Sequence, residues 1–214
     1  MRVEKQPKQL LKDIAYDKIK ELILTEKVEP NHMLSERELI DILEMSKTPI
    51  KSALIRLESE GFVKISSKQG IIVLDISLER ILNIYDLRVA LESFVCAKLH
   101  MKLTQSEIAV LQVAIDEMDT AASNKDVHHF TKWDHEFHLT MARLTENYEI
   151  ERVLLNYNDQ LKRITFKHLK KDVERMAQFN EEHKAILASL SDPKGEPARL
   201  IEEHLIQSKQ KLLN

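Results

Sequence analysis

Apolar residues near the start of the chain recur at helical spacing, and this pattern predicts a first helix that ends at Pro30 and Asn31. Ser35 and Glu38 have the spacing of a capping box, in which each side chain bonds a backbone N–H of the other residue. We therefore expect a second, short helix that opens at Ser35 and runs through Leu43. The apolar residues of the first helix are Leu10, Leu11, Ile14, Ile19, Leu22 and Ile23.

A third helix is predicted directly after the second. Ser46 or Thr48 can cap it, and Pro49 fits its first turn because an N–H has no helical partner there. Gly61 is a natural stop at the other end. The apolar face of this helix consists of Ile50, Ala53, Leu54 and Leu57.

Two β-rich runs follow at residues 62–65 and 71–74, and residues 66–70 join them as the tip of a hairpin. Three helices followed by a hairpin form the outline of a winged helix-turn-helix, which is a DNA-binding arrangement. We assign this domain to residues 1–75.

The remainder of the chain keeps an apolar period near that of an α-helix, and no further strand pattern appears in it. We expect an all-helical bundle over residues 76–214, so the fold class is mainly α. The clearest break in this half is the segment 192–197, which holds two prolines and a glycine. The predicted helices cover residues 78–101, 104–123, 126–145, 147–169, 172–190 and 197–213.

Composition limits the partners and the compartment. The formal net charge is −3, so there is no overall basic field, and any contact with DNA must come from a local patch. The single cysteine, Cys96, excludes an internal disulfide and fits a reducing cytoplasm. Because no run of about 18 apolar residues occurs, we expect a cytoplasmic protein that does not enter a membrane.

The predicted third helix has the features of a DNA-recognition helix, which presents its N-terminal residues to the major groove. It begins Ser46-Lys47-Thr48, and Lys51 follows Lys47 by one turn. The hydroxyl groups can donate to phosphates, and a helix N-terminus favours an anion. Arg37 opens the preceding helix and can reach the DNA backbone or a base. The alternative is an ordinary solvated charged face on a small helical domain.

The hairpin tip offers a second contact with DNA. Lys68, Gln69 and Gly70 lie there, where a turn can approach the minor groove. Acidic residues roughly balance the basic ones across the whole domain, so the placement of the charges must decide whether DNA binds.

Histidines in the helical half suggest a metal site. Asp134 and His138 are four residues apart, so both project from one helix face, and this spacing suits one divalent ion. His183 and His204 each border apolar residues that should face the core, so the four side chains can converge from three helices. The alternative is a set of ordinary histidines, hydrogen-bonded in the core or at the surface. Four others are expected to face solvent, although His135 competes for the ion: His128, His129, His135 and His168.

Sequence motifs in the first domain resemble those of a known family. The segments LSEREL from Leu34 and SKTPIKSALIRLESEG, which ends at Gly61, are similar to the GntR superfamily of transcription regulators. Lys47 and Lys51 stand where that family usually has arginine, and lysine cannot form the bidentate fork to guanine, so the operator should differ. The positions that the resemblance assigns to DNA contact are Arg37, Ser46, Lys47, Thr48, Lys51 and Gly70.

The helical half resembles the ligand-binding domain of the FadR-type branch of that family, called FCD. The resemblance rests on LRVALE at 87–92, the Asp134–His138 segment, EHKAI at 182–186 and a final His204. Many members bind a divalent metal with one aspartate and three histidines. The resemblance therefore assigns the metal to Asp134, His138, His183 and His204, with Zn²⁺, Ni²⁺ or Mn²⁺ as suitable ions.

A five- or six-coordinate ion would leave positions open for a carboxylate-bearing metabolite. Arg88 is our candidate to clamp the other end of this effector, since a guanidinium binds carboxylate bidentately. The alternative for Arg88 is a salt bridge to Asp86 or Glu92.

The sequence thus predicts a DNA-binding transcription regulator that acts as a homodimer and that an organic acid controls through the metal site. One alternative is a purely structural metal with an apolar, acyl-type effector. Another is a metal-dependent hydrolase or lyase, but no separate general base stands at a fixed spacing such as H-E-x-x-H, so we do not expect an enzyme.

Overall fold

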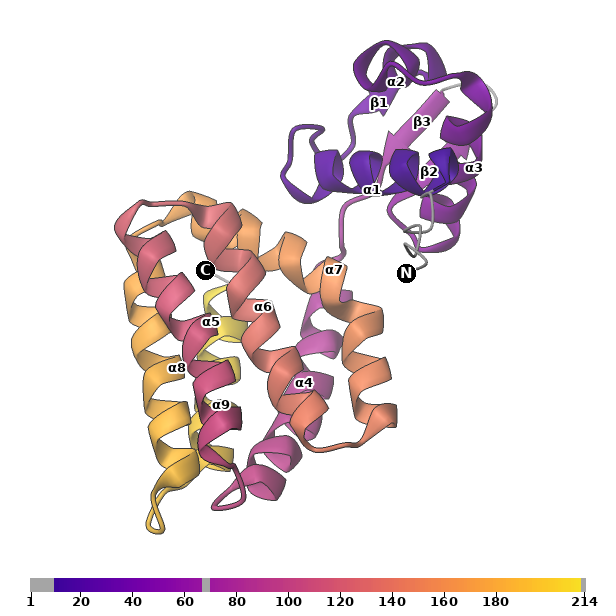
Figure 1. Ribbon diagram of the computed structural model, residues 1–214. Coiled ribbons are helices and arrows are strands. Elements are labelled where there is room, and N and C mark those ends of the chain that lie inside the picture. Colours follow the sequence, from indigo (N-terminus) through magenta and orange to yellow (C-terminus); the bar gives the residue numbers. More distant parts are fainter. Residues whose placement is uncertain (1–9, 67–69, 213–214) are drawn as a thin grey trace, which may run out of the picture. The chain divides into compact units, whose positions relative to one another are not determined.

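The computed structural model describes residues 10–66 and 70–212 (Figure 1). The chain forms two compact units, of which the first ends at Asp75 and the second begins at Ile76. The predicted fold class is confirmed, since a small sheet occurs only in the first unit of the described chain and helices make up nearly all the rest.

Within its described residues, the first unit packs three helices against a three-stranded antiparallel sheet with strand order β1-β3-β2. The short strand β1 was not predicted; it pairs Met33 with Ile72 of β3. The first helix ends at Leu24, earlier than predicted, because Glu26 adopts a left-handed backbone conformation with φ of 50°. The elements are α1 (Leu11–Leu24), β1 (Met33–Leu34), α2 (Glu36–Leu43), α3 (Lys47–Ser59), β2 (Val63–Ser66) and β3 (Gly70–Val73).

Local sequence signals fix α2 and α3. The predicted capping box is present, because Ser35 N donates to Glu38 Oε2 at 2.7 Å and Glu38 N donates to Ser35 Oγ at 3.1 Å. Ser46 is the N-cap residue of α3, but its side chain makes no capping hydrogen bond. Gly61 follows α3 with φ of 79°, which glycine adopts without strain. These boundaries place the first turn of α3 at the surface.

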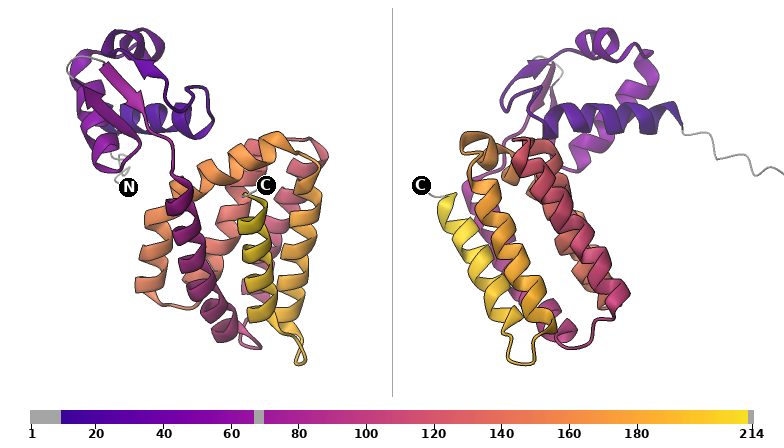
Figure 2. Two further views of the ribbon diagram at one scale, coloured as in Figure 1. Left: turned by 180° about the vertical axis from the view of Figure 1, so that it is seen from behind. Right: turned by 60° about the vertical axis from the view of Figure 1, so that its left-hand side comes forward.

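The second unit is a bundle of helices (Figures 1 and 2). Within it α4 packs against α9, α5 packs against α6 and α8, and α6 packs against α7. The side chains of Ser77 and Thr104 accept hydrogen bonds at the starts of α4 and α5. The elements are α4 (Leu78–Leu99), α5 (Gln105–Ser123), α6 (Val127–Leu144), α7 (Tyr148–Lys171), α8 (Arg175–Ser191) and α9 (Pro197–Lys211).

The core of the bundle brings α5, α6 and α8 together around the fully buried rings of Phe130 and Phe137. The orange helix α7 runs along one side of the bundle and then bends across one end of it (Figure 2). No helix in the described ranges is long and apolar enough to cross a membrane.

The turn between α8 and α9 sets the position of the last helix. A Cβ on Gly195 would lie 2.2 Å from the carbonyl oxygen of Ser189, so only glycine fits this close approach. Pro197 then occupies the first turn of α9, where its missing N–H costs nothing. The tight turn directs α9 back along the bundle, with His204 on its buried side.

Candidate metal centre and DNA-reading surface

The residues that the sequence assigns to DNA contact lie at the surface of the first unit. Arg37 is exposed in the first turn of α2, and Ser46, Lys47, Thr48 and Lys51 are exposed at the start of α3. Short hydroxyls, two ammonium groups and a helix N-terminus are therefore accessible together. This arrangement suits an anionic backbone.

Two details modify this surface. Lys47 Nζ lies 2.8 Å from Glu36 Oε2, so a neighbouring carboxylate partly balances its charge. Gly70 begins β3 with φ of 83°, and a Cβ there would lie 2.7 Å from the carbonyl oxygen of Leu34. Gly70 is thus required by the sheet itself. Lys68 and Gln69, the other predicted tip residues, lie outside the described residues.

The four predicted metal ligands come together inside the second unit. Asp134 and His138 project from α6, His183 from α8 and His204 from α9. One ligand atom from each lies within 4.8 Å of all the others, and all four residues are buried. His183 Nε2 is 3.3 Å from His138 Nε2 and 3.4 Å from Asp134 Oδ1.

Carboxylates support two of these histidines from behind. His138 Nδ1 lies 2.6 Å from Glu92 Oε2, and His204 Nδ1 lies 2.6 Å from Glu182 Oε2. A metal-bound histidine commonly donates its second ring N–H to such a carboxylate, which fixes the tautomer and leaves Nε2 as the ligand. The donor set therefore fits a divalent cation. The lone pairs of three imidazole nitrogens and a carboxylate face one another in a buried space, and a cation would offset their mutual repulsion.

Burial keeps the histidines in the form that binds metal. It lowers the pKa of His183 well below its usual value, and the nearby imidazoles of His204 and His138 lower it further. Burial also lowers the pKa of His138, although Glu92 opposes this shift. A neutral imidazole is the ligand form, so neither ring must lose a proton near neutral pH before it coordinates an ion.

Arg88 forms the ion pair that the sequence left open as an alternative. Its Nε donates to Glu92 Oε1 at 2.6 Å, and both side chains are buried. Burial raises the pKa of Glu92, but Arg88 and His138 outweigh it, and the net shift is strongly downward. Glu92 therefore connects Arg88 to the histidine cluster as a charged bridge.

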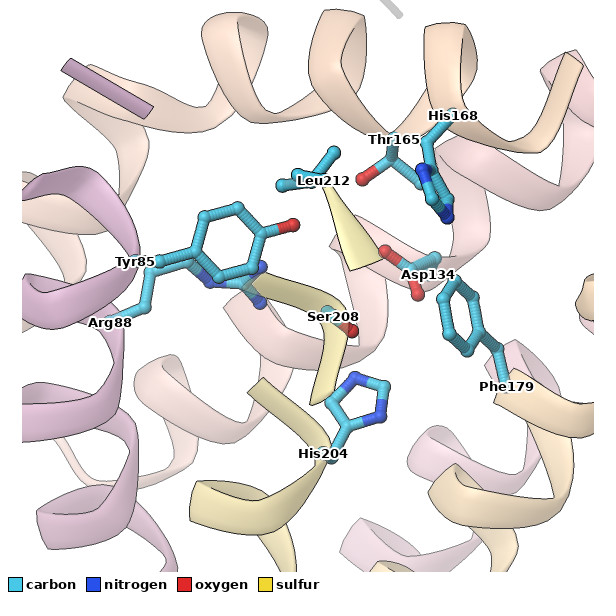
Figure 3. Close-up of a pocket in the computed structure, with 9 residues that line it drawn as sticks. All are labelled: Tyr85, Arg88, Asp134, Thr165, His168, Phe179, His204, Ser208 and Leu212. Carbon is cyan, nitrogen blue, oxygen red and sulfur yellow. The ribbon is translucent and has the colours of Figure 1, made fainter. Parts of the chain in front are cut away.

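A small, narrow pocket opens onto the cluster. In Figure 3, Tyr85 and Arg88 lie on one side of this space, while Asp134, Phe179 and His204 lie on the other. Burial raises the pKa of Tyr85 to about 12, so its hydroxyl stays protonated. The pocket is lined by Tyr85, Arg88, Asp134, Thr165, His168, Phe179, His204, Ser208 and Leu212.

Two histidines expected at the surface are not there. His135 is buried, with Nε2 at 3.1 Å from Thr165 Oγ1, and His168 is half-buried beside Phe179. The prediction was wrong for both because of contacts between helices: Thr165 of α7 packs against His135, and His168, itself on α7, faces Phe179 of α8. His128 is exposed as predicted, and His129 is partly exposed.

Several groups at the site were not identified from the sequence. Tyr85, Thr165, Phe179 and Ser208 line the pocket from four different helices, and no spacing along the chain relates them. Glu182 directly precedes His183, yet it contacts His204 on the next helix. A carboxylate beside a buried histidine is the only signal that could have drawn attention to it.

Comparison with known proteins gives a family match for each of the two units. A model described as "Bacterial regulatory proteins, gntR family" matches residues 11–73, and a model described as "FCD domain" matches residues 83–207. An uncharacterized HTH-type transcriptional regulator of Agrobacterium vitis is 32% identical over 131 residues, which are 60% of this chain and 77% of that protein. The Nta operon transcriptional regulator of Aminobacter aminovorans is 28% identical over 62% of this chain and 63% of its own length.

Solved structures share the fold at low sequence identity. A transcriptional regulator GntR from Rhodococcus sp. RHA1 superimposes with a TM-score of 0.79 and 18% identity, over 94% of this chain and 97% of that one. E. coli McbR/YncC gives a TM-score of 0.74 at 20% identity, over 96% of each chain. These likenesses extend across both units, and the FCD match alone covers more than half of the chain. The chain therefore belongs to the GntR family of bacterial regulators, with an FCD domain as its helical unit.

Proposed function

We propose that this protein is a transcription regulator that reads operator DNA through the exposed start of α3 and responds to a small organic acid held at a metal ion in its FCD domain. The DNA contacts would come from Arg37 and from Ser46, Lys47, Thr48 and Lys51. Gly70, which the sheet requires as a glycine, would lie in the hairpin that approaches the duplex. Two such surfaces in a homodimer would read a two-fold symmetric operator.

The observation that carries the sensor half of this proposal is the buried cluster of Asp134, His138, His183 and His204. These four residues would hold the divalent ion, and Glu92 and Glu182 would orient two of the rings. When bound, the ion would supply a Lewis-acid position for a carboxylate. Imidazole and carboxylate together suit Zn²⁺, Ni²⁺ or Mn²⁺.

The chemistry of the pocket favours an anionic effector. Arg88 keeps guanidinium N–H groups beyond those that contact Glu92, and the pocket wall adds the hydroxyls of Tyr85, Thr165 and Ser208. A small carboxylic acid would meet cationic and hydroxyl donors there. An acyl-type effector has less support, because cationic and hydroxyl groups line this narrow pocket.

Regulation would follow from differential binding. An effector changes the affinity for DNA only if it binds one domain arrangement more tightly than another. The metal site and the pocket share Asp134 and His204, so the ion and the effector would stabilise the same packing of α6 and α9.

A titration on DNA tests this proposal. Metal-loaded protein is mixed with a fragment from upstream of its own gene, and small mono- and dicarboxylic acids are added while electrophoretic mobility is followed. We expect salt-sensitive binding to DNA that at least one acid changes, and loss of that response after chelation of the metal. Absence of any DNA binding would refute the regulator. A response that survives chelation would refute the role of the metal.

A further inference from the structure

Two cationic side chains flank the part of the pocket wall that lies opposite Arg88. His168 and Phe179 form this part of the wall, and Figure 3 shows both across the space from Arg88. The guanidinium carbon of Arg175 lies 5.1 Å from the centre of the Phe179 ring, and Lys211 Nζ lies 5.7 Å from it. Both cations are therefore adjacent to a residue that lines the pocket.

No acidic group neutralises this pair. Among residues 10–66 and 70–212, no carboxylate forms an ion pair with Arg175 or Lys211. Other cations of the same unit do find such partners, since Lys184 pairs with Asp119 and Arg199 pairs with Glu196. Arg175 Nη2 is also buried, and no hydrogen-bond acceptor in the described chain reaches it. A buried donor without an acceptor costs free energy, so an acceptor on a bound ligand would stabilise this arrangement.

The neighbouring His168 adds a donor and does not reduce the positive charge. Arg175 Nη1 and His168 Nε2 lie within hydrogen-bonding distance. A guanidinium can only donate, so Nε2 accepts and the proton of the neutral ring is on Nδ1. Burial lowers the pKa of His168 to about 4, and the charges of the cationic pair and of Lys171 add to this shift. The ring is thus a neutral N–H donor near neutral pH.

The position of Arg175 along its helix is unfavourable for a cation. Arg175 is the first residue of α8, where the helix dipole carries a partial positive charge. The N-cap residue Glu174 makes no side-chain hydrogen bond that would offset this charge. Burial lowers the pKa of Arg175, although the charges of Asp172 and Glu182 oppose this shift. Two sources of positive potential therefore coincide beside the pocket.

We propose that the effector carries a second anionic group, and that Arg175 and Lys211 bind this group while Arg88 binds the first one beside the metal cluster. An arginine binds carboxylate bidentately, a lysine adds a point charge, and His168 Nδ1 offers a third donor. The inference rests on the proposed function, because it concerns the effector of the same pocket. It narrows the effector from small acids in general to dianionic acids, such as unbranched dicarboxylates.

The competing explanation is that both cations only pack on the ring of Phe179. A contact between a cation and an aromatic ring stabilises the folded chain slightly, and it does not depend on the ligand. Loss of such a contact would lower the affinity for all acids equally, or leave it unchanged. Loss of an anion-binding group would lower the affinity for dianionic acids alone.

Calorimetric titration of the zinc-loaded full chain separates these explanations. The probes are dicarboxylates from malonate to adipate, each compared with the monocarboxylate of the same carbon number, from propionate to hexanoate. We expect at least one dicarboxylate to bind the wild type about 10-fold or more tightly than its monocarboxylate partner, as a charge-assisted hydrogen bond implies. Arg175→Gln should abolish most of this preference, and Lys211→Met should reduce it. Monocarboxylate affinity should stay unchanged in both variants.

Matched controls remove the same charges elsewhere in the second unit. Arg152→Gln acts on an exposed arginine of α7, and Lys102→Met acts on an exposed lysine after α4. Both variants should keep the full preference for the dicarboxylate. Zinc content and thermal unfolding without acid show whether each variant folds and holds the metal. If Arg175→Gln fails to fold, Arg175→Lys, which keeps the charge but loses the bidentate fork, and Lys211→Met decide the question.

The result also distinguishes this inference from the proposed function. If every monocarboxylate binds the wild type as tightly as its dicarboxylate partner, or if the folded Arg175 and Lys211 variants keep the full preference, the inference is overturned. A monocarboxylate that changes operator binding in that case still supports the proposed function. If no acid of either series binds the zinc-loaded wild type, the organic-acid effector is refuted and this inference falls with it.

Discussion

The two candidate sites of this protein differ in their relation to solvent. The residues proposed to read DNA lie exposed at the starts of α2 and α3, where Lys47 of α3 pairs with Glu36 of α2 at the surface. The metal cluster is buried and is assembled from α6, α8 and α9, with carboxylates from α4 and α8 behind two of its rings. Substitutions at the first site should change binding and leave stability nearly constant. Substitutions at the second should couple binding to stability, because the same contacts hold the helices together.

The largest effect is expected from His183→Ala, which removes the most deeply buried ligand. Zinc affinity should fall by at least about 100-fold, since loss of even a supporting group behind a ligand typically costs 10–100-fold. The variant should also lose most of the stabilisation that the wild type gains from metal, which is roughly 4 kcal/mol at a thousandfold excess over Kd and falls to about 1.4 kcal/mol when the affinity drops 100-fold. Calorimetric titration and thermal unfolding with and without zinc measure both quantities.

His128→Ala is the matched control for this experiment. His128 is exposed on α6 and lies outside the cluster, so its removal should leave zinc affinity and stability unchanged. Equal zinc affinity in the wild type and His183→Ala would contradict the metal centre altogether.

A smaller loss is expected from Glu182→Gln. The amide can still accept a hydrogen bond from His204 Nδ1, but the negative charge that makes His204 a stronger ligand disappears. Zinc affinity should fall by about 10-fold, at the lower end of the range for such supporting groups. Glu181→Gln, one residue earlier and exposed, is the control. If the two variants bind zinc equally well, Glu182 does not support the ligand.

The difference between the sites also explains what the sequence could predict. The boundaries of α2 and α3 follow from local rules. The capping box of Ser35 and Glu38 starts α2, and the left-handed backbone of Gly61 follows the end of α3, so each signal involves only residues close in sequence. The spacing of Asp134 and His138 on one helix face is equally local. Tertiary packing decides the rest: no local pattern indicates that Thr165 of α7 packs against His135, or that His168 on the same helix faces Phe179 of α8.

Long-range pairing limits the prediction in the first unit as well. Strand β1 contains only Met33 and Leu34, and it exists because β3 offers backbone partners to it. A two-residue strand has no periodicity to detect. The early end of α1 depends on the left-handed residue Glu26, a residue type that rarely marks such a turn.

At the exposed site, Lys51→Ala should weaken operator binding by about 10-fold and reduce the dependence of affinity on salt by about one unit of slope. The free energy of unfolding should stay within about 0.5 kcal/mol of the wild type, because Lys51 is a surface residue. Lys18→Ala removes the same charge from the exposed face of α1 and is the control. Fluorescence anisotropy at several salt concentrations separates the two variants. Equal loss in both would show that net charge, and not the surface of α3, governs binding.

The smallest effect concerns the pH dependence of stability through His168. Burial lowers the pKa of His168 to about 4, and the charges of Arg175, Lys171 and Lys211 lower it further, while Asp172 opposes them. The unfolded chain binds a proton near the ordinary value of 6.5, whereas the folded chain binds it only near 4. Stability should therefore decrease as the pH falls from 6.5 toward 4, and His168→Asn should reduce that decrease.

The magnitude of this last effect tests how far the pocket wall is shielded from solvent. His168 is only half-buried, so solvent screening should limit its share of the decrease to about 1 kcal/mol. Urea unfolding of metal-free protein at several pH values measures it, and His128→Asn at the exposed surface should leave the profile unchanged. Parallel profiles for the wild type and His168→Asn would mean that the ring is solvated in both states, and α7 would then not close this end of the bundle in solution. If only His168→Asn shows a weaker pH dependence of stability, the pocket wall at His168 is shielded from solvent, like the buried metal cluster and unlike the exposed DNA-binding surface.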